Sequence, residues 1–324
     1  MPIKIEDIKK PIVTELEIFE QKFKDSMKSK VPLLDKISHY IIKRKGKQIR
    51  PLFVFLSAKA FGSVNDSTYN GASLIELLHT ATLVHDDVVD DSFERRGFFS
   101  INALWKNKIA VLVGDYLLSR GLLLAINNKE FRILELVSEA VQKMSEGELL
   151  QMEKTRKLDI DESVYFDIIR QKTASLISAA CATGAASTTK DEEIISTMQQ
   201  FGEHAGIAFQ IKDDLFDFGN HDIGKPKGID IKEKKMTLPL IHALRNADSF
   251  TKRKIKYIIK NQSQDSKKVQ EVIDFVVKSD GIKYANEKMN EHKEKAISIL
   301  AKIPESEAKD SLNLLIHFTI NRDK

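Results

Sequence analysis

Four aspartates fall within six positions of the sequence, and their spacing is the first indication of chemistry. Asp86, Asp87, Asp90 and Asp91 follow the apolar run Leu77–Val84. On a helix, residues four apart share a face, so the sequence predicts two carboxylate pairs, Asp86 with Asp90 and Asp87 with Asp91. Each bare pair destabilises a helix by roughly a few tenths of a kcal/mol. Either a solvated face or a divalent cation such as Mg²⁺ must offset this repulsion.

The residues on either side of these acids favour the cation. The helix before them should be buried, because its side chains are mostly apolar. The segment Glu94–Gly97 follows, and it contains two adjacent guanidinium groups, Arg95 and Arg96. Guanidinium groups bind phosphate oxygens through pairs of parallel hydrogen bonds. The sequence therefore predicts a site for a metal ion and a phosphate at the end of this helix.

A second acidic cluster repeats this arrangement farther along the chain. The apolar run 201–218 contains Asp213, Asp214 and Asp217, which have the same D-D-x-x-D spacing as the first three acids. A loop rich in Gly, Pro and Lys follows at 224–239. Two solvated acidic faces are the alternative, but the repetition favours function. We expect the two clusters to face one another and to hold Mg²⁺ ions that bridge a diphosphate.

A basic segment earlier in the chain is suited to an anionic substrate. Lys47 and Arg50 lie in KRKGKQIRP, just before the apolar helix expected at 52–61. Pro51 suits the first position of that helix, so the two cations lie at a helix N-terminus, where backbone N–H groups favour an anion. A solvated basic loop would have the same composition and remains the alternative.

Two further positions could contact a substrate. His79 lies about two helical turns before Asp86, so it could reach a bound molecule, although a lone histidine on an apolar helix is more often a core residue. Lys172 and Thr173 are surrounded by small residues. Small residues there allow either close helix packing or room for a ligand.

The composition predicts the elements that position these residues. The chain of 324 residues contains 14 glycines and 7 prolines, well below the averages of roughly 7% and 5%. So few helix breakers indicate long helices, and a hydrophobic content of 42% suffices for a large core. We predict a single all-α domain over residues 1–324. Helices are expected at 11–30, 33–42, 52–61, 70–91, 104–126, 131–155, 162–186, 191–218, from about 239, and, with lysine-rich faces, over 248–324.

Charge and targeting signals limit the function classes. The net charge is +4, from 51 basic and 47 acidic residues, so we predict no nucleic-acid partner. The single cysteine, Cys181, fits a reducing compartment. The N-terminus lacks a signal-peptide pattern, and the nearest approach to a membrane span, 109–126, is interrupted by Asp115 and Arg120. We therefore expect a cytoplasmic protein. We expect Asp115 either to form an ion pair with a cation such as Arg120 or to cap a polar network near the site.

In combination, these motifs resemble those of the trans-isoprenyl diphosphate synthases over most of the chain. The shared patterns occur in the family's order: G-K-x-x-R-P at 46–51, H-x(6)-D-D-x-x-D with R-R-G at 79–97, K-T at 172–173, F-Q-x-x-D-D-x-x-D at 209–217, and GKPxGxD followed by KMTLP at 224–239. The resemblance implies the all-helical isoprenoid-synthase fold, in which helices surround a deep central cavity, and usually a homodimer.

The resemblance also implies a role for each matching residue. In the acidic clusters, Asp86, Asp90 and Asp213 would bind Mg²⁺, while Asp87, Asp214 and Asp217 would act in the same clusters or through water. The allylic diphosphate would be held by Arg95, Lys172, Thr173, Gln210, Lys225 and Lys235, with Lys172 also assisting catalysis. Isopentenyl diphosphate would bind to Lys47, Arg50, His79 and Arg96. Lys45 stands where the family often has glycine.

The implied reaction adds isopentenyl diphosphate head to tail to an allylic diphosphate. Product length should depend on what lies below the first acids. Thr82 and Ala81, four and five positions before Asp86, are small, and Leu78 and Ile75 lie farther down. The floor would then be about 16 Å away at about 1.5 Å per residue. This favours a long-chain polyprenyl diphosphate of the quinone side-chain type, with a farnesyl or geranylgeranyl product as the alternative. Release of such a product could involve transient membrane contact.

Three other interpretations explain less of the sequence. A metal-dependent HD-type phosphohydrolase would use His85 and Asp86, but the eight histidines lack its pattern and the second acidic cluster would be unexplained. A terpene cyclase normally has an N-S-E type second motif and lacks KMTLP. A non-catalytic partner subunit tends to lose acids, whereas this chain keeps both clusters.

Overall fold

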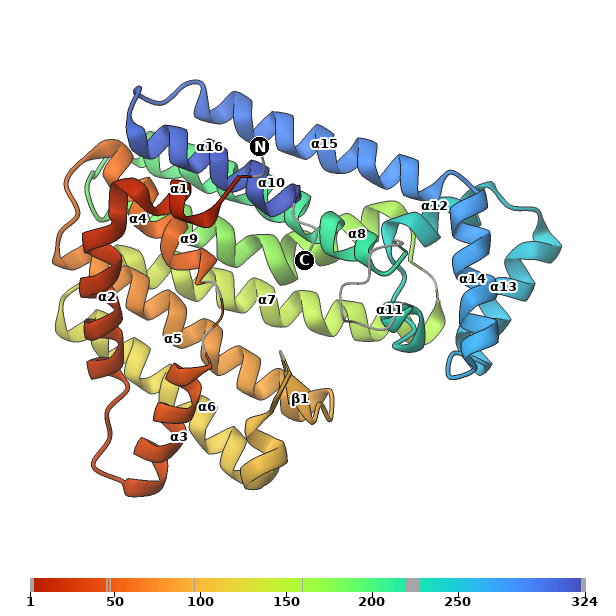
Figure 1. Ribbon diagram of the computed structural model, residues 1–324, viewed down its shortest axis with the longest axis horizontal. Coiled ribbons are helices and arrows are strands. Elements are labelled where there is room, and N and C mark those ends of the chain that lie inside the picture. The colour runs from red at the N-terminus through yellow and green to blue at the C-terminus, as the bar shows by residue number, and fades with distance from the viewer. Residues whose placement is uncertain are drawn as a thin grey trace.

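The described part of the chain is almost entirely helical (Figure 1). The structure is a computed structural model that describes residues 3–44, 46, 48–95, 97–158, 160–218 and 228–321, with only the backbone for Arg95 and Lys157. The elements before the middle of the chain are α1 (Ile5–Lys9), the 3₁₀ turn η1 (Lys10–Ile12), α2 (Val13–Ser26), α3 (Pro32–Lys43), α4 (Ile49–Phe61), α5 (Asp66–Val89), β1 (Glu94–Arg95), β2 (Phe98–Phe99), α6 (Ile101–Asn127) and α7 (Phe131–Lys157).

The second half continues the helical pattern, which confirms the predicted all-α class. Its elements are α8 (Glu162–Ile169), the π-helical turn η2 (Arg170–Ala174), α9 (Ser175–Ala186), α10 (Glu192–Phe216), α11 (Ile229–Lys232), α12 (Leu238–Asn246), α13 (Ser249–Asn261), α14 (Ser266–Lys278), α15 (Gly281–Leu300) and α16 (Glu307–Ile320).

The long helices lie side by side, and α9 is at their centre (Figure 1). This helix contacts α4, α7 and α10, while α15 covers the other side of α10. Its sequence, SLISAACATGAA, consists mostly of small side chains, and nearly all of them are buried. A Cβ atom at Gly184 would lie 2.2 Å from Val54 O. Glycine is therefore required for α9 to approach α4 this closely.

Helix α5, which carries the first acids, is fixed at its start and along its length. Asn65 Oδ1 accepts a hydrogen bond from Thr68 N at 3.1 Å, and Thr68 Oγ1 accepts one from Asn65 N at 3.3 Å. This reciprocal capping satisfies two backbone donors at the helix start. Farther along, α5 packs against α6 so closely that a Cβ atom at Gly114 would lie 2.1 Å from His85 Nε2.

The same contact between α5 and α6 corrects one expectation. Asp115 Oδ1 lies 3.5 Å from His85 Nε2, whereas Arg120 Nε donates to Ser26 O at 2.9 Å. The expected ion pair between Asp115 and Arg120 is therefore wrong. Asp115 of α6 lies near His85 of α5 and not near a residue of its own helix, because the close packing of α5 on α6 brings the imidazole to the aspartate.

Helix ends also differ from the predicted boundaries. α5 ends at Val89, and Asp91 has a left-handed φ of 48°. Asp91 therefore does not continue the helix, and the predicted pairing of Asp87 with Asp91 on one helical face is wrong. The helix expected over 162–186 is divided by the π-helical turn, and the helix expected over 11–30 is divided at Val13. A short antiparallel pair of strands, β1 and β2, was not predicted.

Helix α6 presents apolar side chains outward. Leu104, Val111, Leu112, Leu122, Leu123 and Ile126 are all at least 40% exposed. By length and composition alone α6 could cross a membrane, and most of its apolar stretch is not buried within the protein. The helix continues through Asp115 and Arg120, and its one interruption is a kink near its start at Lys106, which has a φ of 73°.

Candidate functional site

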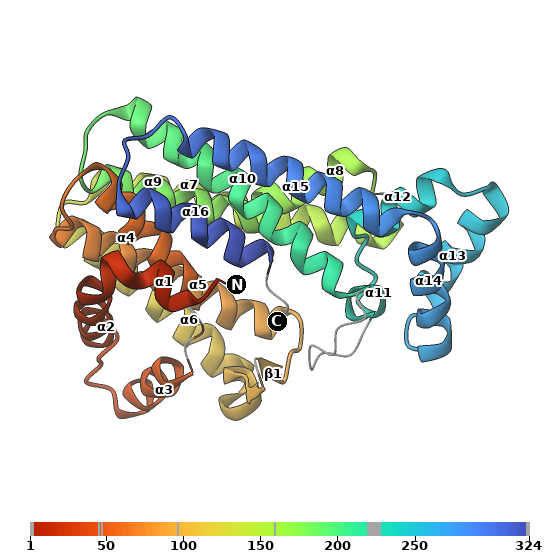
Figure 2. The ribbon, with the colours of Figure 1, turned by 45° about the horizontal axis from the view of Figure 1, so that its top comes forward.

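The C-terminal ends of α5 and α10 lie on the same side of the bundle (Figure 2). Lys235 lines a cavity with Asp214 of the second cluster, and its Nζ lies 2.5 Å from Glu233 Oε2 and 3.9 Å from Asp230 Oδ1. Burial lowers the pKa of Lys235, but attraction by Glu233, Asp230 and Asp90 outweighs it, so the pKa is raised. Asp90 belongs to the first cluster and Asp230 follows the second, so carboxylates from both regions attract this ammonium group.

The three acids of the first D-D-x-x-D motif have different environments. Asp86 is partly exposed, Asp87 is buried, and Asp90 is exposed at the helix end. Asn102 Nδ2 donates to Asp87 O at 3.0 Å and holds the last turn of α5 against α6. Asp86 and Asp90 are therefore the solvent-accessible members of the cluster. Of the basic residues predicted nearby, Arg96 and the side chain of Arg95 lie outside the described residues.

Asp214, in the second cluster, is held in a buried network. Tyr165 donates its hydroxyl hydrogen to Asp214 Oδ2 at 2.7 Å, and Gln210 Nε2 donates to Oδ1 at 2.8 Å. Thr173 Oγ1 then donates to Gln210 Oε1 at 2.7 Å. Burial and the nearby Asp230 raise the pKa of Asp214 to about 8, despite the two donors. The predicted substrate residues Thr173 and Gln210 are thus connected to this acid.

Asp217 fixes the segment that follows α10. Its Oδ1 accepts a hydrogen bond from Ile229 N at 2.8 Å, whereas its buried Oδ2 has no hydrogen-bond partner among the described residues. Gly228 has a φ of 73°, a conformation that favours glycine, and it allows the chain to turn into α11. Burial, followed by the charge of Asp230, raises the pKa of Asp217 to about 6.

A cavity of about 260 Å³ adjoins this second cluster. Its lining includes Gln151, Lys172, Asp214, Asp230 and Lys235. Lys172 Nζ donates to Gln151 Oε1 at 3.0 Å and forms an ion pair with Glu148. Lys172 lies in the π-helical turn, a local widening that is frequent at functional sites. The geometry therefore places Lys172 and Lys235 in one polar cavity beside the acids.

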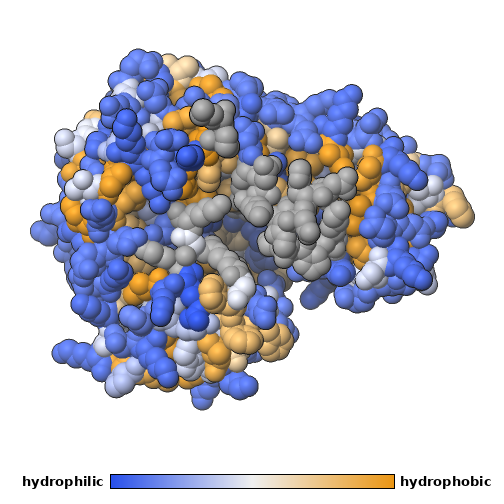
Figure 3. Space-filling model, viewed as in Figure 1, coloured by the Kyte–Doolittle hydropathy of each residue, from blue (hydrophilic) through white to orange (hydrophobic). Residues whose placement is uncertain are grey.

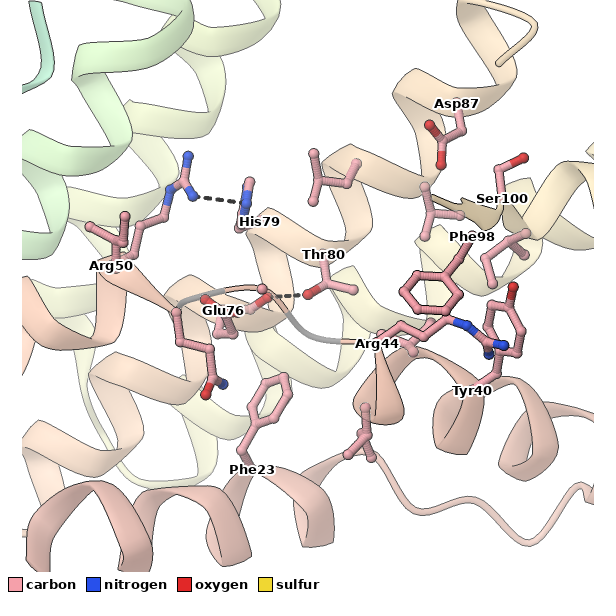
Figure 4. A pocket seen from close by; sticks show the side chains of 18 of the residues that line it. Phe23, Tyr40, Arg44, Arg50, Glu76, His79, Thr80, Asp87, Phe98 and Ser100 are labelled. Carbon is pink, nitrogen blue, oxygen red and sulfur yellow. Dashed lines mark hydrogen bonds between the residues drawn. The ribbon is translucent and has the colours of Figure 1, made fainter. Parts of the chain in front are cut away.

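A larger cavity of about 440 Å³ opens beside α5 (Figure 4). Arg50 and His79 point toward one another there, with Arg50 Nη1 2.8 Å from His79 Nε2. Arginine can only donate, so His79 Nε2 accepts this bond and the ring is neutral. Asp87 and Phe209 also line the cavity, together with apolar side chains from α3 and β2. The structure thus brings together Arg50 and His79, while Lys47 and Lys225 lie outside the described residues.

The residues predicted to set product length lie on a different side of α5. Ala81 and Leu78 are buried, and Thr82 is partly buried. Leu78 lies against α6, because its side chain would be 3.6 Å from a Cβ atom at Gly121. None of these residues lines either of the two cavities described above. Their role in product length stays a prediction.

Sequence reasoning missed several residues of the site. Asp230 raises the pKa of two acids and contacts Lys235, yet no role was assigned to it. Its signal was the GKPxGxD pattern, of which it is the final residue. Tyr165, Glu148 and Gln151 carried no recognisable signal, because they reach the site from other helices.

The donor atoms fit a divalent cation that is bound together with its substrate. Within the described ranges, no group of three or more His, Cys, Asp or Glu side chains is already arranged as a metal site. The side chains at the C-terminal ends of α5 and α10, which form the mouth of the site, are nevertheless carboxylates, and Mg²⁺ prefers such ligands. Asp217 Oδ2, which is buried and has no hydrogen-bond partner among the described residues, is an acceptor that a cation could use.

Comparison with known proteins accounts for this arrangement. The family model described as polyprenyl synthetase matches residues 31–276. This chain belongs to the polyprenyl synthetase family. It is 35% identical to the octaprenyl diphosphate synthase of Escherichia coli (strain K12) over 304 residues, which cover 93% of each chain. It is also 35% identical to the all-trans-nonaprenyl-diphosphate synthase (geranyl-diphosphate specific) of Rhodobacter capsulatus, over 98% of each chain.

A solved structure supports the same assignment for the fold. The polyprenyl synthase from Caulobacter crescentus CB15, complexed with calcium and isoprenyl diphosphate, superposes with a TM-score of 0.92. It is 29% identical to this chain and covers 100% of it, and this chain covers 99% of that one. The predicted isoprenoid-synthase fold is therefore confirmed. The predicted reaction class, a long-chain trans-prenyltransferase, is also confirmed by the relatives of this polyprenyl synthetase.

Proposed function

We propose that this polyprenyl synthetase is a homodimer that uses Mg²⁺ to add isopentenyl diphosphate repeatedly to an allylic diphosphate, giving an all-trans long-chain product in the cytoplasm. The observation that carries the proposal is the polar cavity that Lys172, Asp214, Asp230 and Lys235 line together, on the side of the bundle where α5 and the first cluster also end. We infer that both D-D-x-x-D motifs border one space that can hold a diphosphate.

Asp86, Asp90 and Asp213 would hold the Mg²⁺ ions, and Asp87, Asp214 and Asp217 would complete the two clusters. When bound, Mg²⁺ supplies positive charge where the allylic C–O bond breaks and diphosphate departs. Lys172, Thr173, Gln210 and Lys235 line the adjoining polar cavity and would orient the allylic diphosphate. Because these groups are held by hydrogen bonds before substrate arrives, they need little rearrangement as charge develops.

The second substrate would bind on the other side of the mouth. Arg50 can donate to phosphate oxygens, and His79 lies at its side. The double bond of isopentenyl diphosphate then attacks the allylic carbon, one carbon–carbon bond forms, and the adjacent carbon loses a proton. The released diphosphate is the acceptor we favour for this proton. Apolar side chains around the larger cavity would keep water away from the cationic centre.

The exposed apolar face of α6 supports the homodimer. Its outward leucines and isoleucine form an apolar stripe along α6, which the exposed Asp115 and Ser119 interrupt between Leu112 and Leu122. An apolar stripe of this size on a helix typically marks a protein interface. A second copy of this chain would cover the stripe by the same contact on each subunit.

The test is an assay of the purified protein with isopentenyl and farnesyl diphosphates. We expect condensation only when Mg²⁺ is present, long-chain products on chromatography, and loss of activity with a chelator. The Asp213→Asn variant should lose about 100- to 1,000-fold in rate, since a charged ligand is removed. Asp7→Asn, at an exposed position on α1, is the matched control and should be unchanged. Hydrolysis, cyclisation or an absence of product would contradict the proposal.

A further inference from the structure

Helix α13 has a composition unlike that of its neighbours. Ser249–Asn261 contains five basic side chains and no acidic one. By contrast, the basic residues of α15 alternate with glutamates and form ion pairs such as Lys295 with Glu291. Among the described residues, Lys252, Arg253, Lys256 and Lys260 form no ion pair. Only Lys254 does, with Glu271 of α14.

The outward face of α13 combines cations with aromatic rings. Phe250, Arg253, Lys254, Tyr257 and Lys260 recur at spacings of three and four, so they share one face. Phe250 is 78% exposed and Tyr257 is 58% exposed. The opposite face consists of the buried Ile255, Ile258 and Ile259, which attach the helix to the protein. The exposed rings are thus not needed for this packing.

The helical hairpin of α13 and α14 projects from one end of the molecule (Figures 1 and 2). In Figure 3 this end is mainly hydrophilic, with a small hydrophobic area at its tip. No other described helix lies outside α13 in these views, so a flat surface could approach it without collision.

The hairpin also lies next to the diphosphate site. A Cβ atom at Gly228 would lie 2.3 Å from Val269 Cγ1 of α14. Gly228 precedes Ile229, whose N–H binds Asp217 Oδ1. The first turn of α14, beside the connection between α13 and α14, therefore packs directly on the segment that follows the second acidic cluster. A surface bound by α13 would be close to the mouth from which product leaves.

We propose that α13 docks on a bilayer rich in anionic lipid and brings the mouth of the site to the membrane. The cations would lie among the lipid headgroups, and the rings of Phe250 and Tyr257 would enter the interface, where amphipathic aromatic residues are favoured. The inference rests on the proposed function, because a long polyprenyl product is too apolar to leave readily into water. The aromatic pair and that product favour a bilayer over a nucleic acid or an acidic protein.

Vesicle co-sedimentation of the full chain tests the docking. With vesicles of 30% phosphatidylglycerol and 70% phosphatidylcholine at about 0.1 M salt, we expect binding that is lost with pure phosphatidylcholine or near 1 M salt. Arg253→Gln with Lys260→Gln should lower the partition coefficient by about 30-fold, since each cation near the surface contributes about fivefold. Phe250→Ser with Tyr257→Ser should also weaken it. Lys24→Gln with Lys190→Gln removes the same charge from exposed positions elsewhere and should have no effect.

A second readout separates this proposal from the proposed function. All variants should perform a single condensation in solution at the rate of the unmodified protein, since α13 touches no substrate. Multiple turnover to long product should be accelerated by anionic vesicles only when α13 is intact. The docking proposal is overturned if the protein does not bind the vesicles, or if the α13 and control variants bind them equally. It is also overturned if the protein binds a single-stranded oligonucleotide more tightly than it binds the vesicles. Failure of the single condensation would instead overturn the proposed function.

Discussion

Individual side chains at the mouth are held in place before any substrate binds. Asp214 accepts hydrogen bonds from Tyr165 and Gln210, and Gln210 accepts one from Thr173. Such a chain fixes the carboxylate and also lowers its pKa, in opposition to the burial that raises it. The position of Asp214 is therefore determined by residues from α8, η2 and α10 together.

Removing one donor from this chain should weaken the binding of Mg²⁺. In Tyr165→Phe, Asp214 loses a hydrogen bond to a charged group, which is worth about 1.5–3 kcal/mol. We expect the Mg²⁺ concentration for half-maximal rate to rise about tenfold, while the rate at saturating Mg²⁺ changes little. A titration of rate against Mg²⁺ measures this effect. Tyr257→Phe, at an exposed ring, is the control, and equal titration curves for the two variants would refute the assignment.

At the scale of elements, α5 serves two purposes with different faces. One face, which includes Glu76, His79 and Asp87, lines the larger cavity. Another carries the predicted chain-length residues, among which Leu78 lies against α6. The predicted chain-length residues Thr82 and Leu78 lie about one and two turns before Asp86. The helical period places the larger cavity on another side of α5, which carries residues 76, 80, 83 and 87.

A bulky residue at one of the predicted chain-length positions of α5 should shorten the product. Ala81→Phe would place a ring where the sequence predicts the floor below the first acids, so we expect products several isoprene units shorter, measured by chromatography. Ala81 is fully buried, and overpacking can cost about 1–3 kcal/mol. Thr82→Phe at the less buried neighbouring position provides a second variant, and thermal unfolding checks both folds. Unchanged product length in two folded variants would exclude these positions as the floor.

The exposed face of α6 predicts the assembly state. Leu112 is 56% exposed and Leu123 is 51% exposed, so Leu112→Glu with Leu123→Glu should leave the monomer intact but place charges in the interface. Light scattering after size-exclusion chromatography should show a dimer for the unmodified protein and a monomer for this variant. Val277→Glu, on the exposed side of α14, should remain a dimer. A monomeric unmodified protein would contradict the prediction.

At the scale of the whole molecule, α10 links the catalytic mouth to the C-terminal helices. It packs against α9 on one side and α15 on the other. His204 of α10 and His292 of α15 meet with their Nδ1 atoms 3.1 Å apart, and Phe166 stacks on His292. Burial lowers the pKa of both histidines, and His204 further lowers that of His292, which is about 4.

This histidine pair should make folding stability depend on pH. The folded state disfavours protonation, whereas the unfolded chain binds protons near pH 6.5, so stability is fully present above that pH and falls as pH drops toward 4. Because the pair is only half-buried, we expect about 1 kcal/mol less stability at pH 5 than at pH 7 from this source. Urea unfolding of the protein and of His204→Gln with His292→Gln measures it. The variant should lose that part of the pH dependence, and equal slopes would refute the prediction.

The sequence by itself determined the helical class and both acidic clusters, because a 3.6-residue period and a D-D-x-x-D spacing are local properties of the chain. It also indicated Lys172, Gln210 and Lys235 through motifs. Only the tertiary structure decided that Asp115 meets His85, that Tyr165 and Asp230 control Asp214, and that Asp91 lies beyond the end of α5. These outcomes depend on which helices pack together and on how closely glycines such as Gly114 let them approach. Such contacts join residues far apart in the chain, and no local pattern encodes them.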